Sequence, residues 1–143
     1  MTINISNNDI KLVMNEAKKA SQASVSPYSK FSVGVAILTE SGNIYRGTNL
    51  ENSAYGSTIC AEVMAVGATI IGMKDVEIET GKKSKAILIG VYSPNAKKVT
   101  PCGNCRQILY ELNQEIELLY EDEKGEAKVY AKVKDLLPSA FGL

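Results

Sequence analysis

The stretch AILIGVYSPNAKKVTPCGNCRQ, residues 86–107, decides the fold class. Its first seven residues form a continuous apolar run, which is typical of a central strand covered on both faces. The segment SPNAKKV ends that strand. Thr100 and Pro101 then predict a helix over residues 101–113, because threonine is a good N-cap and proline is favoured at the first helical position. A buried strand followed by a helix indicates an α/β protein.

The segments on either side extend this pattern. The expected elements are an amphipathic helix over 8–24, a hairpin of strands over 31–38 and 44–51, a nearly all-apolar helix over 59–73, strands over 116–120 and 127–131, and a brief helical turn after residue 132. Ser57 or Thr58 is available to cap the apolar helix. The order αββαβαββ, with crossover helices after the second and third strands, predicts a three-layer α/β/α sandwich on a mixed five-stranded sheet.

Composition limits the class of protein. With 143 residues and 45% hydrophobic side chains, the chain fits a single domain over residues 1–143. Its 16 basic residues balance 16 acidic ones, so it lacks the positive excess that drives binding to polymeric nucleic acid. The opening segment has no apolar signal-peptide core, and no run of about 18 apolar residues could cross a bilayer. We therefore expect a soluble cytoplasmic protein that binds neither nucleic-acid polymers nor membranes.

The three cysteines of the chain are expected to converge. Cys60 stands at the start of the apolar helix, and Cys102 and Cys105 lie three residues apart at the start of the next one. A helix N-terminus favours the thiolate that a metal requires, and zinc suits a tetrahedral sulfur site. The chain has no histidine, so three protein ligands leave a fourth position for water, which is the pattern of a catalytic zinc.

Glu62 gains a role from this arrangement. Residues two apart on a regular helix do not face each other, so Glu62 can act beside the metal only if Cys60 sits at the very start of the helix. The carboxylate could then take a proton from water and hand it to a substrate, as a general base and then a general acid. The arrangement is similar to that of zinc deaminases, in which three cysteines are a permitted ligand set and such a glutamate stands outside the coordination sphere.

Three simpler interpretations remain open at this stage. Cys102 and Cys105 could form a redox dithiol, although Cys60 would then be unexplained. The three thiols could be unrelated core residues. The zinc could also be structural, with Glu62 or a residue of another subunit as its fourth ligand.

Five ordered motifs, YSKFSVG, NLENSAYG, CAE, PCGNCRQ and LLPSAF, span most of the chain. In this order they resemble the small homotetrameric cytidine deaminases. The resemblance implies hydrolytic deamination of cytidine and deoxycytidine to uridine and deoxyuridine in pyrimidine salvage, by a zinc enzyme whose active sites are shared between subunits.

The resemblance also implies roles for individual residues. It makes Cys60, Cys102 and Cys105 the zinc ligands and Glu62 the proton shuttle. The substrate contacts that it implies are Asn49 and Glu51 with the ribose hydroxyls, Phe31 with the pyrimidine, the Ala61 backbone with the base carbonyl, and Phe141 and Tyr55 at a site shared with a neighbouring subunit. For the aromatic residues, packing in the core is the alternative.

One position departs from the family pattern. Val63 stands where the family usually has arginine after Cys-Ala-Glu. Three thiolates on Zn²⁺ leave a net charge of about −1, which hydrogen bonds around the ligands can offset, and Arg106 is the arginine left in sequence to do so. Blasticidin-type deaminases are similar in having an aliphatic residue here. Two alternative functions are therefore kept. The protein could deaminate an aminopyrimidine nucleoside analogue of the blasticidin S type, or it could be a catalytically silent zinc-binding homologue.

Overall fold

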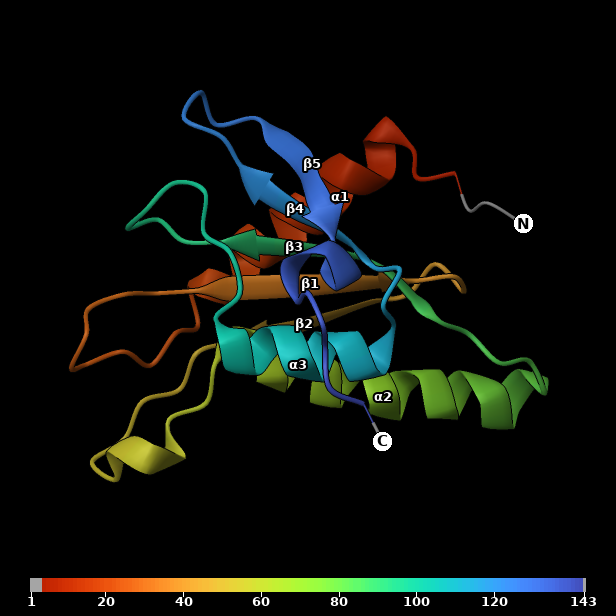
Figure 1. Ribbon diagram of the computed structural model, residues 1–143, viewed down its shortest axis with the longest axis horizontal. Helices are drawn as coiled ribbons and strands as arrows, with labels where there is room; N and C mark the ends of the chain where they lie inside the picture. The colour runs from red at the N-terminus through yellow and green to blue at the C-terminus, as the bar shows by residue number, and fades with distance from the viewer. Residues whose placement is uncertain (1–3, 143) are drawn as a thin grey trace.

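The structure, a computed structural model, describes residues 4–142. Its elements follow the predicted order. They are α1 (Asn7–Ser21), β1 (Gly34–Thr39), β2 (Ile44–Thr48), the 3-10 turn η1 (Tyr55–Ser57), α2 (Ala61–Thr80), β3 (Ala86–Tyr92), α3 (Gly103–Leu112), β4 (Glu117–Glu121), β5 (Ala127–Lys132) and the 3-10 turn η2 (Val133–Leu136). The mixed five-stranded sheet is confirmed, with strand order β2-β1-β3-β4-β5 (Figure 1).

Strands β1 and β3 form the buried part of the sheet. β1 runs antiparallel to both β2 and β3, and β3 runs parallel to β4. A parallel pair needs a crossover connection, and α3 supplies it between β3 and β4. All six residues of β1 are buried, because helices cover the sheet on both sides.

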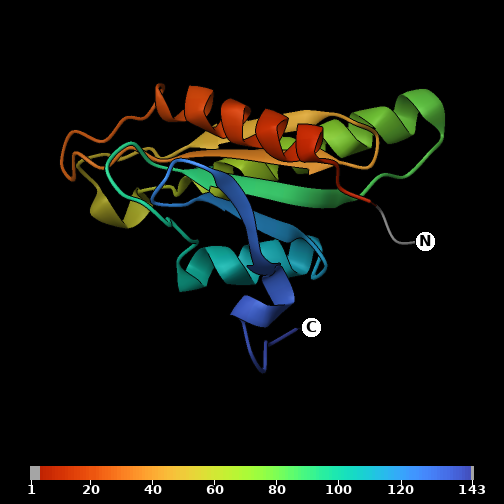
Figure 2. The same ribbon diagram turned by 90° about the horizontal axis from the view of Figure 1, so that it is seen from above.

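Side chains of β1 alternate between two hydrophobic clusters. Val35 and Ile37 pack with residues of α2 and α3, whereas Ala36 and Leu38 pack with residues of α1. This alternation follows from the two-residue period of a strand. Figure 2 shows α1 and α3 on opposite sides of the sheet. The predicted three layers are therefore confirmed.

Two glycines allow helices to lie directly on strands. A Cβ atom at Gly34 would stand 2.0 Å from the Ala17 carbonyl oxygen of α1, and one at Gly47 would stand 2.3 Å from the Ala61 carbonyl oxygen of α2. Real Cβ atoms do not approach backbone atoms so closely, so any larger residue would push the helix away. Gly47 thus fixes the start of α2 against β2.

The predicted helix boundaries need correction. α1 ends at Ser21 and not at residue 24, and α2 continues to Thr80, where Gly81 with φ 70° closes it. The N-caps are Cys60 and Cys102, not Ser57, Thr58 or Thr100. The chain remains extended at both cysteines, with ψ 151° and 171°. This leaves their sulfur atoms at the helix ends.

Candidate active site

Three sulfur atoms meet between the starts of α2 and α3. Cys60 and Cys102 are the N-caps of these helices, and Cys105 lies in the first turn of α3. The Cys60 and Cys102 side chains make no capping hydrogen bond, so their sulfurs are available to a ligand. The ligand atoms of all three lie within 4.8 Å of one another, and the Cys102 and Cys105 sulfurs are 3.6 Å apart. The predicted convergence of the three cysteines is confirmed.

The donor set fits zinc. Sulfur atoms bound tetrahedrally at about 2.3 Å from one zinc ion stand roughly 3.8 Å apart, close to the observed spacing. Cys105 is fully buried and Cys60 is half-buried. Burying several acidic groups together is costly unless a cation offsets their charge, and three cysteine sulfurs favour a soft or borderline cation. The described residues can therefore hold a metal ion, and zinc suits them best.

The thiol pKa values differ within the cluster. The pKa of Cys102 is lowered, chiefly by the nearby backbone N–H of Cys105 in the first turn of α3. Burial raises the pKa of Cys60 and of Cys105. The sequence-based expectation that a helix start favours the thiolate is therefore met at Cys102 alone, because desolvation outweighs the helix end at the other two. Binding a cation would favour the thiolate at all three.

Glu62 is buried beside these sulfurs. It is the second residue of α2 and only 6% exposed, and burial raises the pKa of its carboxyl group. Glu62 lines the same cavity as Cys60 and Cys102, and its charge adds to the effect of burial in raising the pKa of Cys60 and Cys105. The geometric condition set by the sequence is thus met, since Cys60 precedes the helix. A carboxyl group with a raised pKa is suited to exchange protons near neutral pH.

A cavity of about 310 Å³ opens beside Cys60 and Glu62. Four of the predicted substrate contacts line it, namely Phe31, Asn49, Glu51 and Ala61. It is also lined by residues that were not singled out as contacts, which are Ser29, Val33, Thr58, Ile59, Val99 and Thr100. Ser29 lies in the motif YSKFSVG, so that motif pointed to it, but its partners became visible only in the fold.

Asn49 joins the end of β2 to the segment before β1. Its Oδ1 accepts from Val33 N at 2.9 Å and from Ser24 Oγ at 2.6 Å, and its Nδ2 donates to Phe31 O at 2.8 Å. The strand predicted over 44–51 ends at Thr48, so Asn49 and Glu51 lie beyond the regular part of the strand. Both residues nevertheless line the same cavity.

Comparison with known proteins identifies the family. Residues 7–119 match the model of the cytidine and deoxycytidylate deaminase zinc-binding region, a range that contains Glu62 and all three cysteines. The chain belongs to the cytidine and deoxycytidylate deaminase family. It is 38% identical to a cytidine deaminase of Sporosarcina psychrophila over 93% of this chain and 91% of that one. It is 35% identical to a cytidine deaminase of Halalkalibacterium halodurans, over 93% and 94% of the two chains.

Solved structures of this deaminase family share the fold. A cytidine deaminase from Burkholderia pseudomallei superposes with a TM-score of 0.73 at 31% identity and covers 92% of this chain and 98% of its own. A cytidine deaminase from Mycobacterium tuberculosis gives 0.72 at 31% identity, over 94% and 98% of the two chains. No helix among residues 4–142 is long and apolar enough to cross a membrane.

Arg106 has other hydrogen-bond partners in this deaminase-family site than those predicted. It was expected to donate to thiolate sulfur, but its Nε donates to the Pro101 carbonyl at 2.9 Å and its Nη1 to the Leu136 carbonyl at 3.0 Å. Among the hydrogen bonds of the described residues, none joins Arg106 to a cysteine sulfur. The guanidinium therefore ties η2 to the segment that carries Cys102, since two carbonyls lie within its reach.

The two remaining predicted contacts, Tyr55 and Phe141, lie outside the cavity. Tyr55 in η1 is 73% exposed and packs edge-to-face on Tyr28, with the ring centroids 5.5 Å apart. Phe141 is 69% exposed, and its carbonyl accepts from Gln107 Nε2 at 2.9 Å, which holds the C-terminal tail beside α3. Neither ring belongs to the core, so the alternative of core packing is wrong for both.

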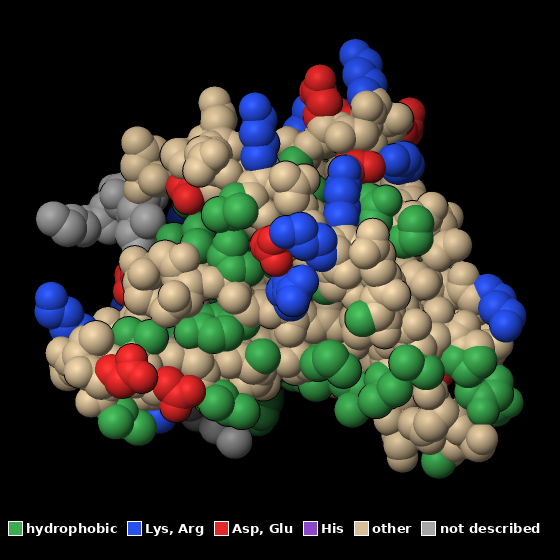
Figure 3. All heavy atoms as spheres, turned by 180° about the vertical axis from the view of Figure 1, so that it is seen from behind, with side chains coloured by type: hydrophobic (Ala, Val, Ile, Leu, Met, Phe, Trp, Pro, Cys, Tyr) green, Lys and Arg blue, Asp and Glu red, His purple; other side chains and the backbone are tan. Residues whose placement is uncertain are grey.

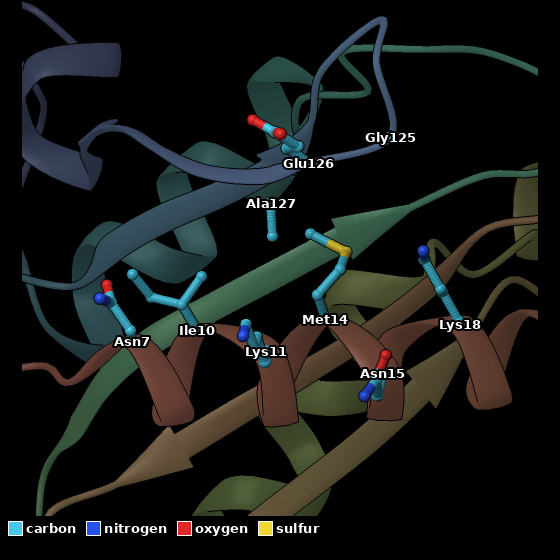
Figure 4. A pocket seen from close by; sticks show the side chains of 9 residues that line it. All are labelled: Asn7, Ile10, Lys11, Met14, Asn15, Lys18, Gly125, Glu126 and Ala127. Carbon is cyan, nitrogen blue, oxygen red and sulfur yellow. The ribbon is translucent and has the colours of Figure 1, made fainter.

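A larger cavity of about 540 Å³ lies on the opposite side of the sheet, between α1 and the start of β5 (Figure 4). Its apolar side chains are Ile10, Met14 and Ala127, and Lys11 and Lys18 stand along the helix at its edge. None of the predicted site residues lines it. Despite its size, it therefore has no part in the chemistry of the cysteine cluster.

Proposed function

We propose that this chain is a zinc-dependent cytidine deaminase that converts cytidine and deoxycytidine to uridine and deoxyuridine and releases ammonia. The observation that carries the proposal is the convergence of three cysteine sulfurs beside a cavity that Cys60, Cys102 and the buried Glu62 line. Cys60, Cys102 and Cys105 would hold the zinc. The curated relatives are named cytidine deaminases, which does not favour the nucleoside-analogue or silent-homologue alternatives.

Glu62 performs the proton transfers in this mechanism. A zinc ion in such a site supplies Lewis acidity that makes water a competent nucleophile near neutral pH. The Glu62 carboxylate takes a proton from the attacking water and delivers it to the base, and the amino group leaves as ammonia after a further proton transfer. The balance is one water consumed for one ammonia released. Burial of Glu62, which raises its pKa, makes its protonated form accessible for the second role.

The remaining cavity residues bind and orient the nucleoside. Phe31 packs against the pyrimidine, the Ala61 backbone contacts the base carbonyl, and Asn49 and Glu51 bind the sugar hydroxyls. Among the described residues that line the cavity, the charged side chains apart from the cysteines are Glu51 and Glu62, with no lysine or arginine. A phosphate group would meet this negative charge without a counter-ion. We therefore expect a nucleoside substrate rather than a nucleotide or a polynucleotide.

Assembly as a homotetramer belongs to the same proposal. Exposed isoleucines on α2, namely Ile70, Ile71 and Ile78, leave an apolar surface that is unusual for an isolated monomer. Figure 3 shows hydrophobic side chains along the edge of the molecule where α2 and η1 lie. Tyr55 and Phe141, which are exposed in one chain, would contact the active site of a neighbour.

We further propose that residues 1–143 act as one catalytic domain in the cytoplasm, in pyrimidine salvage.

A direct comparison of substrates tests the function. Ammonia release is measured with cytidine, deoxycytidine, cytidine monophosphate and blasticidin S, on protein whose zinc content has been determined. We expect one zinc per chain and turnover of the two nucleosides, with cytidine monophosphate and blasticidin S much slower. Zinc-loaded protein that releases no ammonia from either nucleoside would refute the proposal. Faster turnover of blasticidin S would replace it with the analogue deaminase.

A further inference from the structure

One serine hydroxyl connects two residues of the cavity wall. Ser29 Oγ donates to Glu51 Oε1 and accepts from the backbone N–H of Phe31 at 3.1 Å. The backbone N–H groups of Tyr28 and Ser29 donate to Glu51 Oε2 at 2.9 and 3.1 Å. We propose that Ser29 is a positioning residue of the deaminase, which orients the Glu51 carboxylate to accept a hydrogen bond from a single hydroxyl group of the substrate sugar. This inference rests on the proposed function.

The Glu51 carboxylate has room to accept a hydrogen bond from only about one sugar hydroxyl. An ionised carboxylate offers about four lone-pair positions. Two on Oε2 are filled by the Tyr28 and Ser29 amides, and one on Oε1 is filled by the Ser29 hydroxyl. About one position on Oε1 therefore remains for a ligand. Because Ser29 and Glu51 both line the cavity, that position serves the nucleoside.

The Ser29 hydroxyl has a definite direction in this network. A hydroxyl has one proton to donate. Glu51, as a carboxylate, can only accept, and the Phe31 amide can only donate, so the proton of Ser29 must point to Glu51. The hydrogen bond to Glu51 also helps to keep this carboxylate ionised, and the pKa of Glu51 is lowered chiefly by the Ser29 hydroxyl. Ser29 thus fixes the orientation of the group that meets the sugar and favours its ionised form.

Phe31 is held independently of Ser29 on its other side. Its carbonyl accepts from Asn49 Nδ2 at 2.8 Å, and the next residue but one, Val33, donates to Asn49 Oδ1 at 2.9 Å. Removing the Ser29 hydroxyl would therefore leave the Phe31 backbone held by Asn49 while the Glu51 carboxylate loses a donor. The expected damage is confined to the sugar end of the cavity.

The test uses Ser29→Ala with two matched variants. Ser32→Ala is the control, since it makes the same change three residues along the same segment, where the hydroxyl lies 3.5 Å from Ser26 Oγ and outside the cavity lining. Ser29→Thr retains the hydroxyl. Uridine and 1-methyluracil are compared as competitive inhibitors, because the second carries the base without a sugar. The Michaelis constant and kcat for cytidine are measured alongside.

Ser29→Ala should weaken uridine binding by roughly 10-fold, which is the scale of one hydrogen bond to a charged group. Binding of 1-methyluracil should stay unchanged. KM for cytidine should rise with uridine Ki, while kcat stays within about threefold, because the lost interaction is made equally in ground and transition states. Ser29→Thr should return to within about threefold of wild type through its retained hydroxyl, and Ser32→Ala should match wild type.

Equal weakening of both inhibitors, or no effect of Ser29→Ala on uridine, would overturn the inference. Should Ser29→Ala not fold, Glu51→Gln decides, because it must reproduce the uridine-selective loss for the assignment to stand. Failure of the proposed function looks different. There, wild-type protein would neither release ammonia from cytidine nor bind uridine, whatever residue occupies position 29.

Discussion

At the scale of single residues, Glu62 combines burial with a raised pKa beside the cysteine cluster. Glu62→Gln keeps the size and shape of the side chain but cannot exchange a proton. We expect the variant to retain zinc and to bind uridine, while kcat for cytidine falls by at least about 10²- to 10⁴-fold. Metal analysis, uridine binding and ammonia release on one preparation check this. Near-normal turnover would remove Glu62 from the mechanism.

Variants of Arg106 can distinguish the contribution of its positive charge from that of its hydrogen bonds. Its guanidinium bridges the carbonyls of Pro101 and Leu136, which a lysine ammonium reproduces poorly. Losing two partly buried hydrogen bonds from a charged donor should cost roughly 2–4 kcal/mol of unfolding free energy. We expect Arg106→Ala and Arg106→Lys to unfold at lower urea concentration and to release zinc more readily. If Arg106→Lys behaved like wild type, positive charge near the sulfurs would be its main contribution.

These residues show what sequence alone could supply. The three cysteines were predictable because each stands next to a helix start, and local signals locate helix starts to within a few residues. The partner of Arg106 was not predictable, because Leu136 lies 30 residues away and meets it only through the packing of η2 on α3. The contacts of Ser29 were hidden for the same reason, since Glu51 lies 22 residues further along the chain.

At the scale of elements, the register of α2 on β2 controls where Cys60 lies. A Cβ at Gly47 would stand 2.3 Å from both Ala61 O and Ala65 N, so Gly47→Ala should displace the start of α2. Overpacking of this kind costs about 1–3 kcal/mol, and zinc affinity should fall with it. Gly67→Ala is the matched control within α2, since a Cβ there meets nothing within 4 Å. It should be neutral or more stable by about 0.5–1 kcal/mol.

Gly47 thus links a strand to the metal site. Equilibrium unfolding and a competitive zinc chelator measure the two effects. Loss of stability in Gly47→Ala with unchanged zinc affinity would mean that α2 adjusts without moving Cys60. Equal behaviour of the two alanine variants would contradict the close approach of α2 to β2.

The element boundaries were predicted unevenly for physical reasons. β3 was predicted at its observed bounds, because a fully buried strand is a continuous apolar run that polar residues end on both sides. The end of α2 was missed by seven residues, 73 against 80, because the segment KDVEIET mixes charged and apolar side chains and its stop is the left-handed Gly81. Pro101 suggested too early a start for α3, since the chain stays extended through Cys102.

The β4–β5 hairpin carries a pH-dependent contribution to stability. Hydrogen bonds from Lys132 and Lys134 lower the pKa of Glu115 to about 2, and a hydrogen bond from Lys128 lowers the pKa of Asp122 to about 2. Both values lie below those of an unfolded chain, about 4. Their stabilisation is therefore complete above pH ~4.5 and is lost as the pH falls toward about 2.

The acid limb of the stability curve tests these carboxylates. We expect the urea midpoint of Glu115→Gln and Asp122→Asn to depend less steeply on pH than that of wild type between about pH 4.5 and 2. Above that window each variant should be less stable than wild type, and the difference should shrink on acidification. If the urea midpoints of wild type and variants changed in parallel with pH, these ion pairs would contribute nothing measurable to stability. Many surface ion pairs behave in this way.

At the scale of the whole molecule, one chain leaves its cavity partly uncovered. The cavity of about 310 Å³ is lined by the segment before β1, the end of β2 and the starts of α2 and α3. Phe141 lies in the tail beside α3 with its ring 69% exposed, and it is not among the residues that line the cavity. If the proposed homotetramer forms, this ring is available to close the cavity of a neighbouring chain.

Mixing two defective variants distinguishes a shared site from an independent one. Phe141→Ala chains keep Glu62 but lose the aromatic ring, so in a shared site KM for cytidine should rise by roughly 10-fold, the scale of burying an aromatic side chain against a ligand. Glu62→Gln chains keep the ring but cannot turn over. When the two are denatured together, refolded with zinc and allowed to assemble, some Phe141→Ala sites receive a Phe141 ring from a Glu62→Gln neighbour. Cytidine kinetics should then show a fraction of sites with wild-type KM, which neither variant shows alone.

If Phe141 served its own chain, mixing would only dilute the weak activity, because each chain would keep its own defect. Recovery of wild-type KM therefore requires both an assembled oligomer and a ring that acts between chains. If light scattering shows the mixture to be tetrameric and wild-type KM does not return, Phe141 acts on its own subunit.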